Sequence, residues 1–156
     1  LMDFSLMDDE PDLEQVRNDL NASLPEGIRV MHIYEPTRKA SGIKWLRVEE
    51  ILEYDAENGA DMAPLLSEFY ARPEIPVLRK TKRGEGVLDI APHISDVTAQ
   101  VREKDVVLRA VISVNEPTIN PDLLIEALRQ NAPELAPDFA KFTRLEVYDE
   151  NMEIFR

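Results

Sequence analysis

The chain has 156 residues, of which 31 are acidic and 18 are Lys or Arg, so its formal net charge is −13. Charge of that sign repels phosphate groups at long range, which disfavours non-specific nucleic-acid binding by the whole surface. The absence of cysteine excludes disulfides, thiolate metal sites and cysteine nucleophiles. No apolar run approaches the ~20 residues of a membrane span, and residues 1–10 lack the basic region of a signal peptide. We therefore expect a cytoplasmic protein without membrane contact.

The first 40 residues predict a strand, a helix and a second strand. Met2–Met7 alternates between apolar and polar side chains, as a half-buried strand does. A helix is expected from Pro11, because Asp12 and Glu14 in its first turn suit the positive end of the helix dipole. Ile28–Glu35 is apolar at most positions, which predicts a central strand.

The segment from Ile43 to Asp55 is compatible with a helix or a strand. Its apolar and acidic residues favour a short helix followed by a strand from about Ile51. The clearest helix lies over Asp61–Ala71, where apolar residues recur at helical spacing and Pro73 follows. Those apolar residues are Met62, Leu65, Leu66, Phe69 and Tyr70.

The remainder of the chain predicts five strands and one helix. Alternation and turn residues favour strands over Ile75–Lys82, Gly86–Ile90, Ser95–Glu103, Asp105–Val114 and Thr143–Tyr148. The first two form a hairpin through Gly84. The helix follows Asn120, a favourable capping residue, with Pro121 at its first position.

This order of elements predicts an α+β fold. It reads β-α-β and then β-α-β-β-β-α-β, the pattern of ferredoxin-like sandwich units in tandem, with antiparallel sheets and helices on one face. Residues 1–40 would supply the C-terminal half of a first, incomplete unit, and residues 41–156 a second unit.

The sequence predicts no catalytic residues, metal site or cofactor. His93 lies near Ser95 and Asp96, but closeness in sequence is not the geometry of a catalytic triad. The acidic segment from Asp55 to Asp61 lacks the ligand pattern of a calcium loop. The glycines of the hairpin do not precede a helix, as a phosphate-binding loop requires. We interpret Glu49, Glu50 and Glu53 as a solvated face.

Two clusters of basic residues run against the overall charge. The first contains Arg79, Lys80, Lys82 and Arg83 at the predicted hairpin, and the second contains Arg38 and Lys39, with Lys44 nearby. One interpretation is a strand edge protected from aggregation by charge. The other is a contact for phosphate, RNA or an acidic partner, which makes Arg79, Lys80, Lys82, Arg83, Arg38 and Lys39 the candidate binding residues.

Several motifs resemble, in order and spacing, the bacterial radical-SAM-linked family of unknown function. They are Leu24–Val30, Arg79–Gly84, Val87–Ile94, Asn120–Leu128 and Thr143–Leu145. The resemblance implies a domain fused C-terminally to a radical SAM protein or encoded beside one. It also implies an N-terminal segment that this sequence lacks, so that Leu1 corresponds to about the third strand of the first unit. It implies no catalytic residues.

The leading hypothesis is an accessory or substrate-binding domain that works with a radical SAM protein. RNA or a ribosomal component is the expected substrate, because tandem ferredoxin-like units recur in RNA-processing proteins, which is an analogy of fold. One alternative is a part of a nucleic-acid-modifying enzyme whose site needs the missing segment. Another is a plain protein–protein interaction module. For this chain alone, the sequence favours a role without catalysis.

Overall fold

The computed structural model describes residues 4, 6–7, 10–35, 38–81 and 84–155. The chain divides into two compact units, residues 1–39 and residues 40–155. Each unit is described by itself below. In the described ranges, no helix is long and apolar enough to cross a membrane.

Unit 1 contains one helix and an extended segment. Helix α1 (Leu13–Ser23) begins after Asp12, whose carboxylate accepts hydrogen bonds from the backbone N–H groups of Glu14 at 3.0 Å and Gln15 at 3.1 Å. The side-chain amide of Asn21 then makes two hydrogen bonds with the backbone of Val30. Its Oδ1 accepts from Val30 N at 2.8 Å, and its Nδ2 donates to Val30 O at 3.1 Å.

The two strands expected in this unit are not formed in its described part. The predicted strand Ile28–Glu35 is wrong, because residues 28–35 have no strand partner. Of the predicted strand Met2–Met7, residues 2, 3 and 5 lie outside the described residues, and residues 4, 6 and 7 are not in a strand. A strand exists only when its backbone pairs with a neighbour. Local apolar pattern alone does not supply that neighbour.

Unit 2 is built on a four-stranded antiparallel sheet in the order β4-β5-β1-β6. Its elements are β1 (Trp45–Glu53), α2 (Gly59–Tyr70), β2 (Pro76–Thr81), β3 (Gly84–Asp89), β4 (Ile94–Arg102), β5 (Asp105–Ser113), α3 (Asp122–Asn131) and β6 (Phe139–Tyr148). Strands β2 and β3 form a separate hairpin inserted between α2 and β4. Without this hairpin, the strand order is that of a ferredoxin-like sandwich. The predicted α+β class is confirmed.

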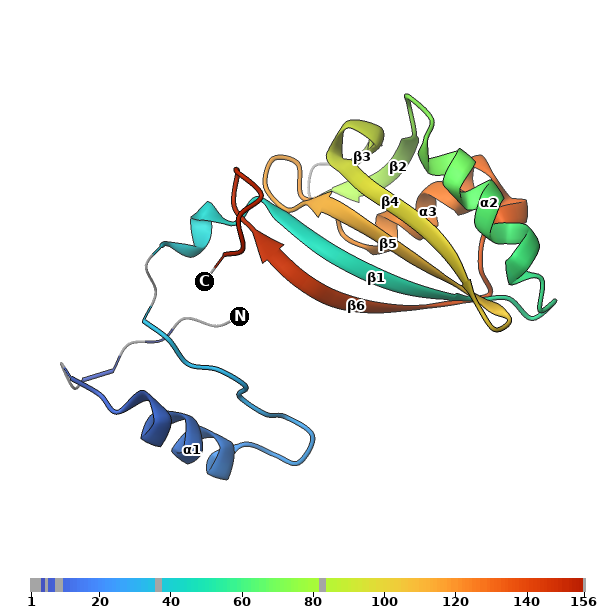
Figure 1. Ribbon diagram of the computed structural model, residues 1–156. Coiled ribbons are helices and arrows are strands. Elements are labelled where there is room, and N and C mark those ends of the chain that lie inside the picture. The colour runs from blue at the N-terminus through green and yellow to red at the C-terminus, as the bar shows by residue number, and fades with distance from the viewer. Residues whose placement is uncertain (1–3, 5, 8–9, 36–37, 82–83, 156) are drawn as a thin grey trace. The chain divides into compact units, whose positions relative to one another are not determined.

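Helices α2 and α3 pack on one face of the sheet and enclose the core. Figure 1 shows the sheet with both helices on one side. The fully buried core includes Leu52 of β1, Leu66 of α2 and Leu128 of α3. Two buried hydroxyls join the layers. Tyr70 donates to Leu124 O at 2.9 Å, and Tyr54 donates to Leu135 O at 3.0 Å.

The helix expected over the start of the Ile43–Asp55 segment is wrong, because β1 already begins at Trp45. β1 is a central strand that pairs with β5 on one side and β6 on the other. Val48, Glu50 and Leu52 alternate toward the core. Glu50, interpreted from sequence as part of a solvated face, is therefore fully buried. In the sequence, the acidic side chains hid the two-residue alternation of polarity that is typical of a strand.

The helix expected after Asn120 is present and begins at Asp122. Asn120 Oδ1 accepts a hydrogen bond from Asp122 N at 3.3 Å. At the other end of α3, side-chain amides form hydrogen bonds with the backbone of β2. Gln130 Oε1 accepts from Leu78 N at 2.7 Å and its Nε2 donates to Leu78 O at 3.0 Å, while Asn131 Nδ2 donates to Pro76 O at 2.9 Å. These amides pair with the β2 backbone much as a neighbouring strand does.

Candidate binding surface

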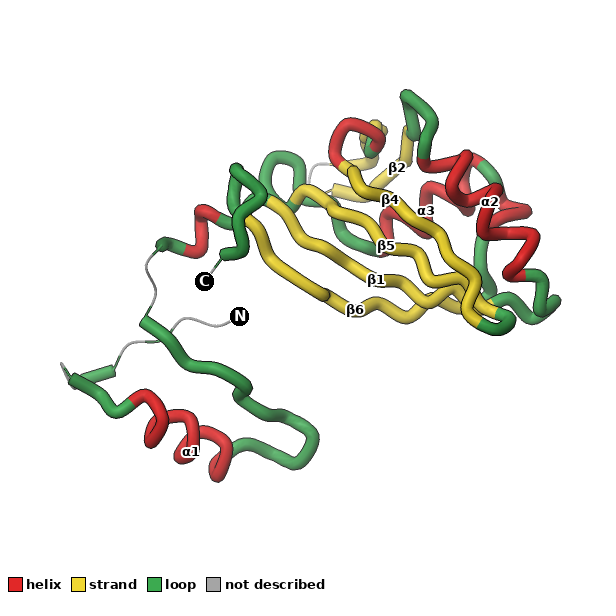
Figure 2. The backbone as a smooth tube through the Cα atoms, in the orientation of Figure 1, coloured by secondary structure: helices red, strands yellow, loops and turns green. Residues whose placement is uncertain are grey.

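The sheet face opposite the helices, here called the outer face, is the candidate site. Even-numbered residues of β1 and β5 lie in the core, so the odd-numbered ones point to the outer face. Within the described part of unit 2, both α-helices contribute to the core on the other side. Figure 2 shows the four strands as a continuous layer.

The best-formed contact on the outer face joins β5 to β1. Arg109 lies opposite Glu49 in the strand register. Its Nε lies 2.8 Å and its Nη2 2.7 Å from Glu49 Oε2. The Glu49 side chain is only 18% exposed, so this pair is partly shielded from water. The ion pair with the neighbouring strand thus fixes the position of the Arg109 side chain.

A second pair crosses from β1 to β4 and is looser. Arg47 Nη2 lies 3.4 Å from Asp96 Oδ2, with the side chains 42% and 64% exposed. The Arg47 guanidinium also lies 5.9 Å from the ring centroid of Tyr148 on β6. An exposed ion pair of this kind contributes about 0–1 kcal/mol. Arg47 can therefore exchange Asp96 for an external anion at little cost.

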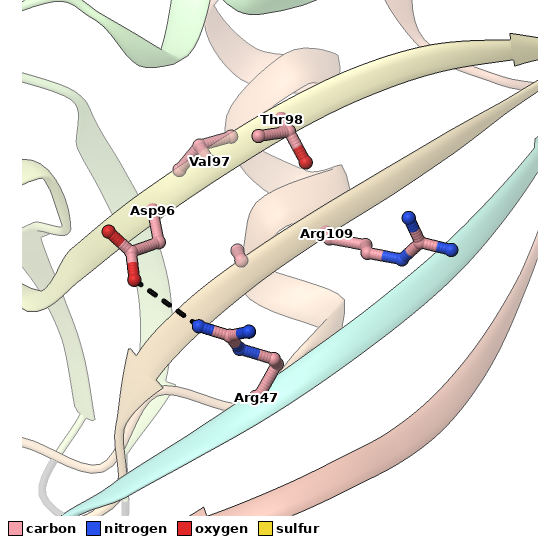
Figure 3. A pocket seen from close by; sticks show the side chains of 6 residues that line it. Arg47, Asp96, Val97, Thr98 and Arg109 are labelled. Carbon is pink, nitrogen blue, oxygen red and sulfur yellow. Dashed lines mark hydrogen bonds and ion pairs between the residues drawn. The ribbon is translucent and has the colours of Figure 1, made fainter. Parts of the chain in front are cut away.

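A β-bulge places Asp96 where it meets Arg47. The register of β4 against β5 shifts between Ser95 and Thr98, and Asp96 adopts a φ of 49°. Bulges redirect side chains in this way and are frequent beside binding sites. The bulge opens a pocket of about 310 Å³, lined by Arg47, Asp96, Val97, Thr98, Arg109 and Ala110. Figure 3 shows Arg47 and Asp96 directed toward one another, with Arg109 farther along the sheet.

Two aromatic residues extend the outer face beyond this pocket. Trp45 of β1 pairs in register with Tyr148 of β6, which places both side chains on the same face. Both are partly exposed. The face thus carries aromatic rings beside a guanidinium, a combination that can stack on planar groups and bind anions.

A buried acid lies on the opposite side of the same strand. Glu50 has no exposed surface, and neither of its carboxylate oxygens accepts a hydrogen bond within the described structure. Burial, reinforced by the negative charge of Asp122, raises the pKa of Glu50 from 4.5 to about 8. Burial, with Glu50 and Tyr54 as further causes, also raises the pKa of Tyr70 well above its usual value. Glu50 therefore carries a proton at neutral pH.

Of the predicted basic residues, Arg79 and Lys80 are not among those that line the outer-face pocket. Arg79 and Lys80 are consecutive on β2 and point to opposite sides of the hairpin. Arg79 is half-buried and its Nη1 lies 3.4 Å from Thr118 O, whereas Lys80 is exposed and pairs in register with Glu85. Lys82 and Arg83 lie outside the described residues. Arg38 and Lys39 belong to unit 1. A joint binding role for these six residues stays a prediction.

No three His, Cys, Asp or Glu side chains come together as a metal site in the described ranges. The hydroxyl hydrogen bonds of Ser23, Ser67, Ser113 and Thr118 all go to backbone carbonyls. On the outer face, a guanidinium lies beside an aromatic ring, a combination that suits the binding of anions and planar groups.

Sequence reasoning missed the outer-face residues for different reasons. Arg109 is the only charged residue among residues 106–114, so it was visible as an outward side chain within a confident strand. Arg47 and Glu49 were not recognised as outward-facing strand residues, because a helix was expected over that segment. The approach of Asp96 to Arg47 depends on a bulge, for which the local sequence gives no signal.

The comparisons with known proteins identify one family. A family described as "Uncharacterized protein conserved in bacteria (DUF2344)" matches residues 1–121. No curated protein and no solved structure matches the chain. The matched region includes Arg47, Glu49, Asp96 and Arg109, and it ends before α3.

Proposed function

The chain belongs to the DUF2344 family of uncharacterised bacterial proteins, and we propose that it is an accessory, substrate-binding domain that works with a radical SAM protein. In this proposal, the chain holds the substrate, and the radical SAM protein performs the chemistry. The motifs whose order and spacing resemble the radical-SAM-linked family support the choice of a radical SAM protein as the partner. The substrate class is single-stranded RNA, free or in a ribosomal particle.

The observation that carries the proposal is the side-chain set on the outer face. Single-stranded RNA is bound by aromatic rings that stack on bases and by cations that contact the backbone. Trp45 and Tyr148 are suited to the first contact, and Arg47 to the second. Arg47 lies 5.9 Å from the Tyr148 ring and is paired only loosely with Asp96. A base and its phosphate could be engaged together at this point.

The outer face carries cations as well as acids, although the chain as a whole is acidic. Arg47, Arg109 and Lys141 all lie on it, by the register of β1 with its two neighbours. By the same register, Glu49, Glu53 and Glu146 lie on this face beside Asp96, so its acids and cations are similar in number and the acidic excess of the chain is not concentrated here. Long-range repulsion from a net charge of −13 slows the approach of RNA, and short-range contacts retain it.

The first experiment tests the partner. The tagged chain and the radical SAM protein encoded in the same genome are co-expressed, and association is measured after purification of either protein. We expect a complex in which the chain changes turnover of the partner's substrate. Failure of the two full-length proteins to associate, together with unchanged turnover, would overturn this part of the proposal.

The second experiment tests the surface. Binding of a fluorescent single-stranded RNA is measured by anisotropy over a range of salt concentrations. Arg47→Ala and Tyr148→Ala should each weaken binding at least several-fold, and Arg47→Ala should also reduce the salt dependence. Arg129→Ala, which removes an exposed arginine of α3, is the matched control. Equal losses in all three variants would point to non-specific attraction instead.

A protein–protein contact through the β2–β3 hairpin is the second candidate. Leu78 and Val87 pair in register, lie on the same face and are 49% and 70% exposed. Lys80 lies on the same side, two residues along the strand. An apolar pair with a flanking cation suits an acidic protein surface. Loss of partner association in Val87→Ser, with RNA binding retained, would favour this candidate for the partner contact.

A further inference from the structure

Residues 28–35 of unit 1 have the composition of a strand but no strand partner. The segment contains Ile28, Val30, Ile33 and Tyr34, which are residue types that favour strands. It shows no turn, bend or helix, and Figure 2 shows it as an uncoiled run in the same unit as α1. Ile28, Met31 and Tyr34 are 60%, 66% and 37% exposed. The segment thus presents apolar side chains that nothing in the described part of unit 1 covers.

One edge of the segment is occupied and the other is open. Both backbone groups of Val30 bind the Asn21 amide. In extended backbone, the groups of alternate residues point to the same side, so even-numbered residues face α1. The groups of Arg29, Met31, Ile33 and Glu35 face away from it. None of these four residues makes a backbone hydrogen bond within the described ranges.

The open edge is complementary to a second copy of itself. Antiparallel pairing centred on His32 places Arg29 opposite Glu35, Met31 opposite Ile33 and Val30 opposite Tyr34. All the hydrogen-bonded pairs in this register are odd-numbered, as the open edge requires. Arg29 and Glu35 are both exposed. Two opposite-charge pairs would flank a centre of apolar pairs, and such cross-strand pairs stabilise sheets.

We propose that residues 28–35 form a homodimer interface, in which two copies of the chain pair antiparallel about a two-fold axis at His32. The interface is isologous, so each copy contributes the same residues. It joins the two extended segments into a two-stranded ribbon with α1 of each copy on its outer edge. The proposal uses unit 1 alone and is independent of the RNA surface.

The absence of cysteine permits a direct test of the register. His32→Cys places the only two thiols of the dimer at a non-hydrogen-bonded pair, about 4.5 Å apart between Cα atoms, which is within disulfide range. Tyr34→Cys is the matched control, because its two copies would lie four residues apart along the ribbon, about 13 Å. Mild oxidation should cross-link His32→Cys at least tenfold faster. Equal rates for the two variants would overturn the register.

Charge exchange tests the interface in solution by sedimentation velocity. Arg29→Glu and Glu35→Arg should each shift the chain toward monomer, and the double variant should recover the dimer. General repulsion between acidic copies makes a different prediction, since Glu35→Arg reduces the negative charge and would then increase association. A wild-type chain that stays monomeric at all concentrations would overturn the proposal, as would pairing only with a strand of another protein.

Discussion

The two units contain similar local sequence signals but differ in what those signals produce. Both have a helix followed by an apolar segment suited to a strand. In unit 2, α2 buries five residues and its neighbouring strands pair into a sheet. In unit 1, α1 buries none, and residues 28–35 remain unpaired in the described structure. Burial requires a second layer, and a strand requires a second strand, so pattern alone is insufficient.

The two units also differ in the groups that they bury. The packed interior of unit 2 retains an uncharged carboxylic acid and two buried phenols. The described part of unit 1 has no buried residue of any kind. Unit 1 should therefore unfold locally at low cost, whereas unit 2 should unfold cooperatively. Trp45, the only tryptophan, lies in unit 2 and reports on that unit alone.

The largest expected effect concerns the buried acid and pH. The folded pKa of Glu50 is about 8, against 4.5 when unfolded. Between these values the folded state binds the extra proton, so the contribution of Glu50 to stability is greatest below pH 4.5 and is lost as pH rises to about 8. The full shift corresponds to at most about 5 kcal/mol. Urea unfolding followed by Trp45 fluorescence at pH 5 to 9 should show this decline.

Glu50→Gln is the critical variant for this prediction. It cannot titrate, so the decline between pH 5 and 8 should largely disappear. Glu49→Gln, at the adjacent outward position, is the matched control and should keep the wild-type slope. Parallel curves for the wild type and Glu50→Gln would show that Glu50 reaches water in the folded state.

The second effect compares leucines in the two units. Leu66 of α2 is fully buried, so Leu66→Ala should lower the free energy of unfolding by about 2–5 kcal/mol. Leu20 of α1 is half-exposed, so Leu20→Ala should cost less than about 1 kcal/mol and leave the Trp45 transition unchanged. Urea midpoints measure both. A shift of the Trp45 transition by Leu20→Ala would mean that the units unfold together.

The elements of unit 2 show which parts of the fold can be read from sequence. β5 was predicted almost residue by residue, because its even positions are apolar and Arg109, the one charged residue after Asp105, points outward. β1 was misassigned at its start because Glu50, an acid, occupies a core position. A buried acid breaks the relation between polarity and exposure on which such predictions rest. The first residues of β6 were missed because they form an edge strand with Phe139 and Lys141 both exposed.

The candidate site was less predictable than the fold. Arg47 and Asp96 are 49 residues apart, and they meet only through strand pairing and a bulge. Trp45 and Tyr148 lie near opposite ends of the sequence of unit 2. They meet because β1 and β6 are neighbouring strands in the sheet. The visible signal, the basic cluster around Arg79, is a run in sequence, yet Arg79 and Lys80 point to opposite sides in β2. Sites assembled by tertiary pairing leave little local trace.

The third prediction removes one hydroxyl from each unit. Tyr70→Phe leaves the buried carbonyl of Leu124 without its donor and should cost about 1–2 kcal/mol. Tyr34→Phe, in unit 1, changes an exposed side chain and should cost almost nothing. Thermal unfolding followed by Trp45 fluorescence distinguishes them. A neutral Tyr70→Phe would indicate that another donor replaces the phenol.

The smallest effect is a local one in unit 1. Asp12 caps α1, and Asp12→Ala should destabilise the helix by about 1 kcal/mol. Because α1 buries no residue, little else opposes its fraying, so amide exchange over Leu13–Ser23 should accelerate several-fold. Asp12→Asn retains a side-chain acceptor and should restore most of the protection. The Trp45 transition should not move in either variant. Accelerated exchange in α2 as well would show that α1 supports unit 2, and the contrast between the two units would then have to be given up.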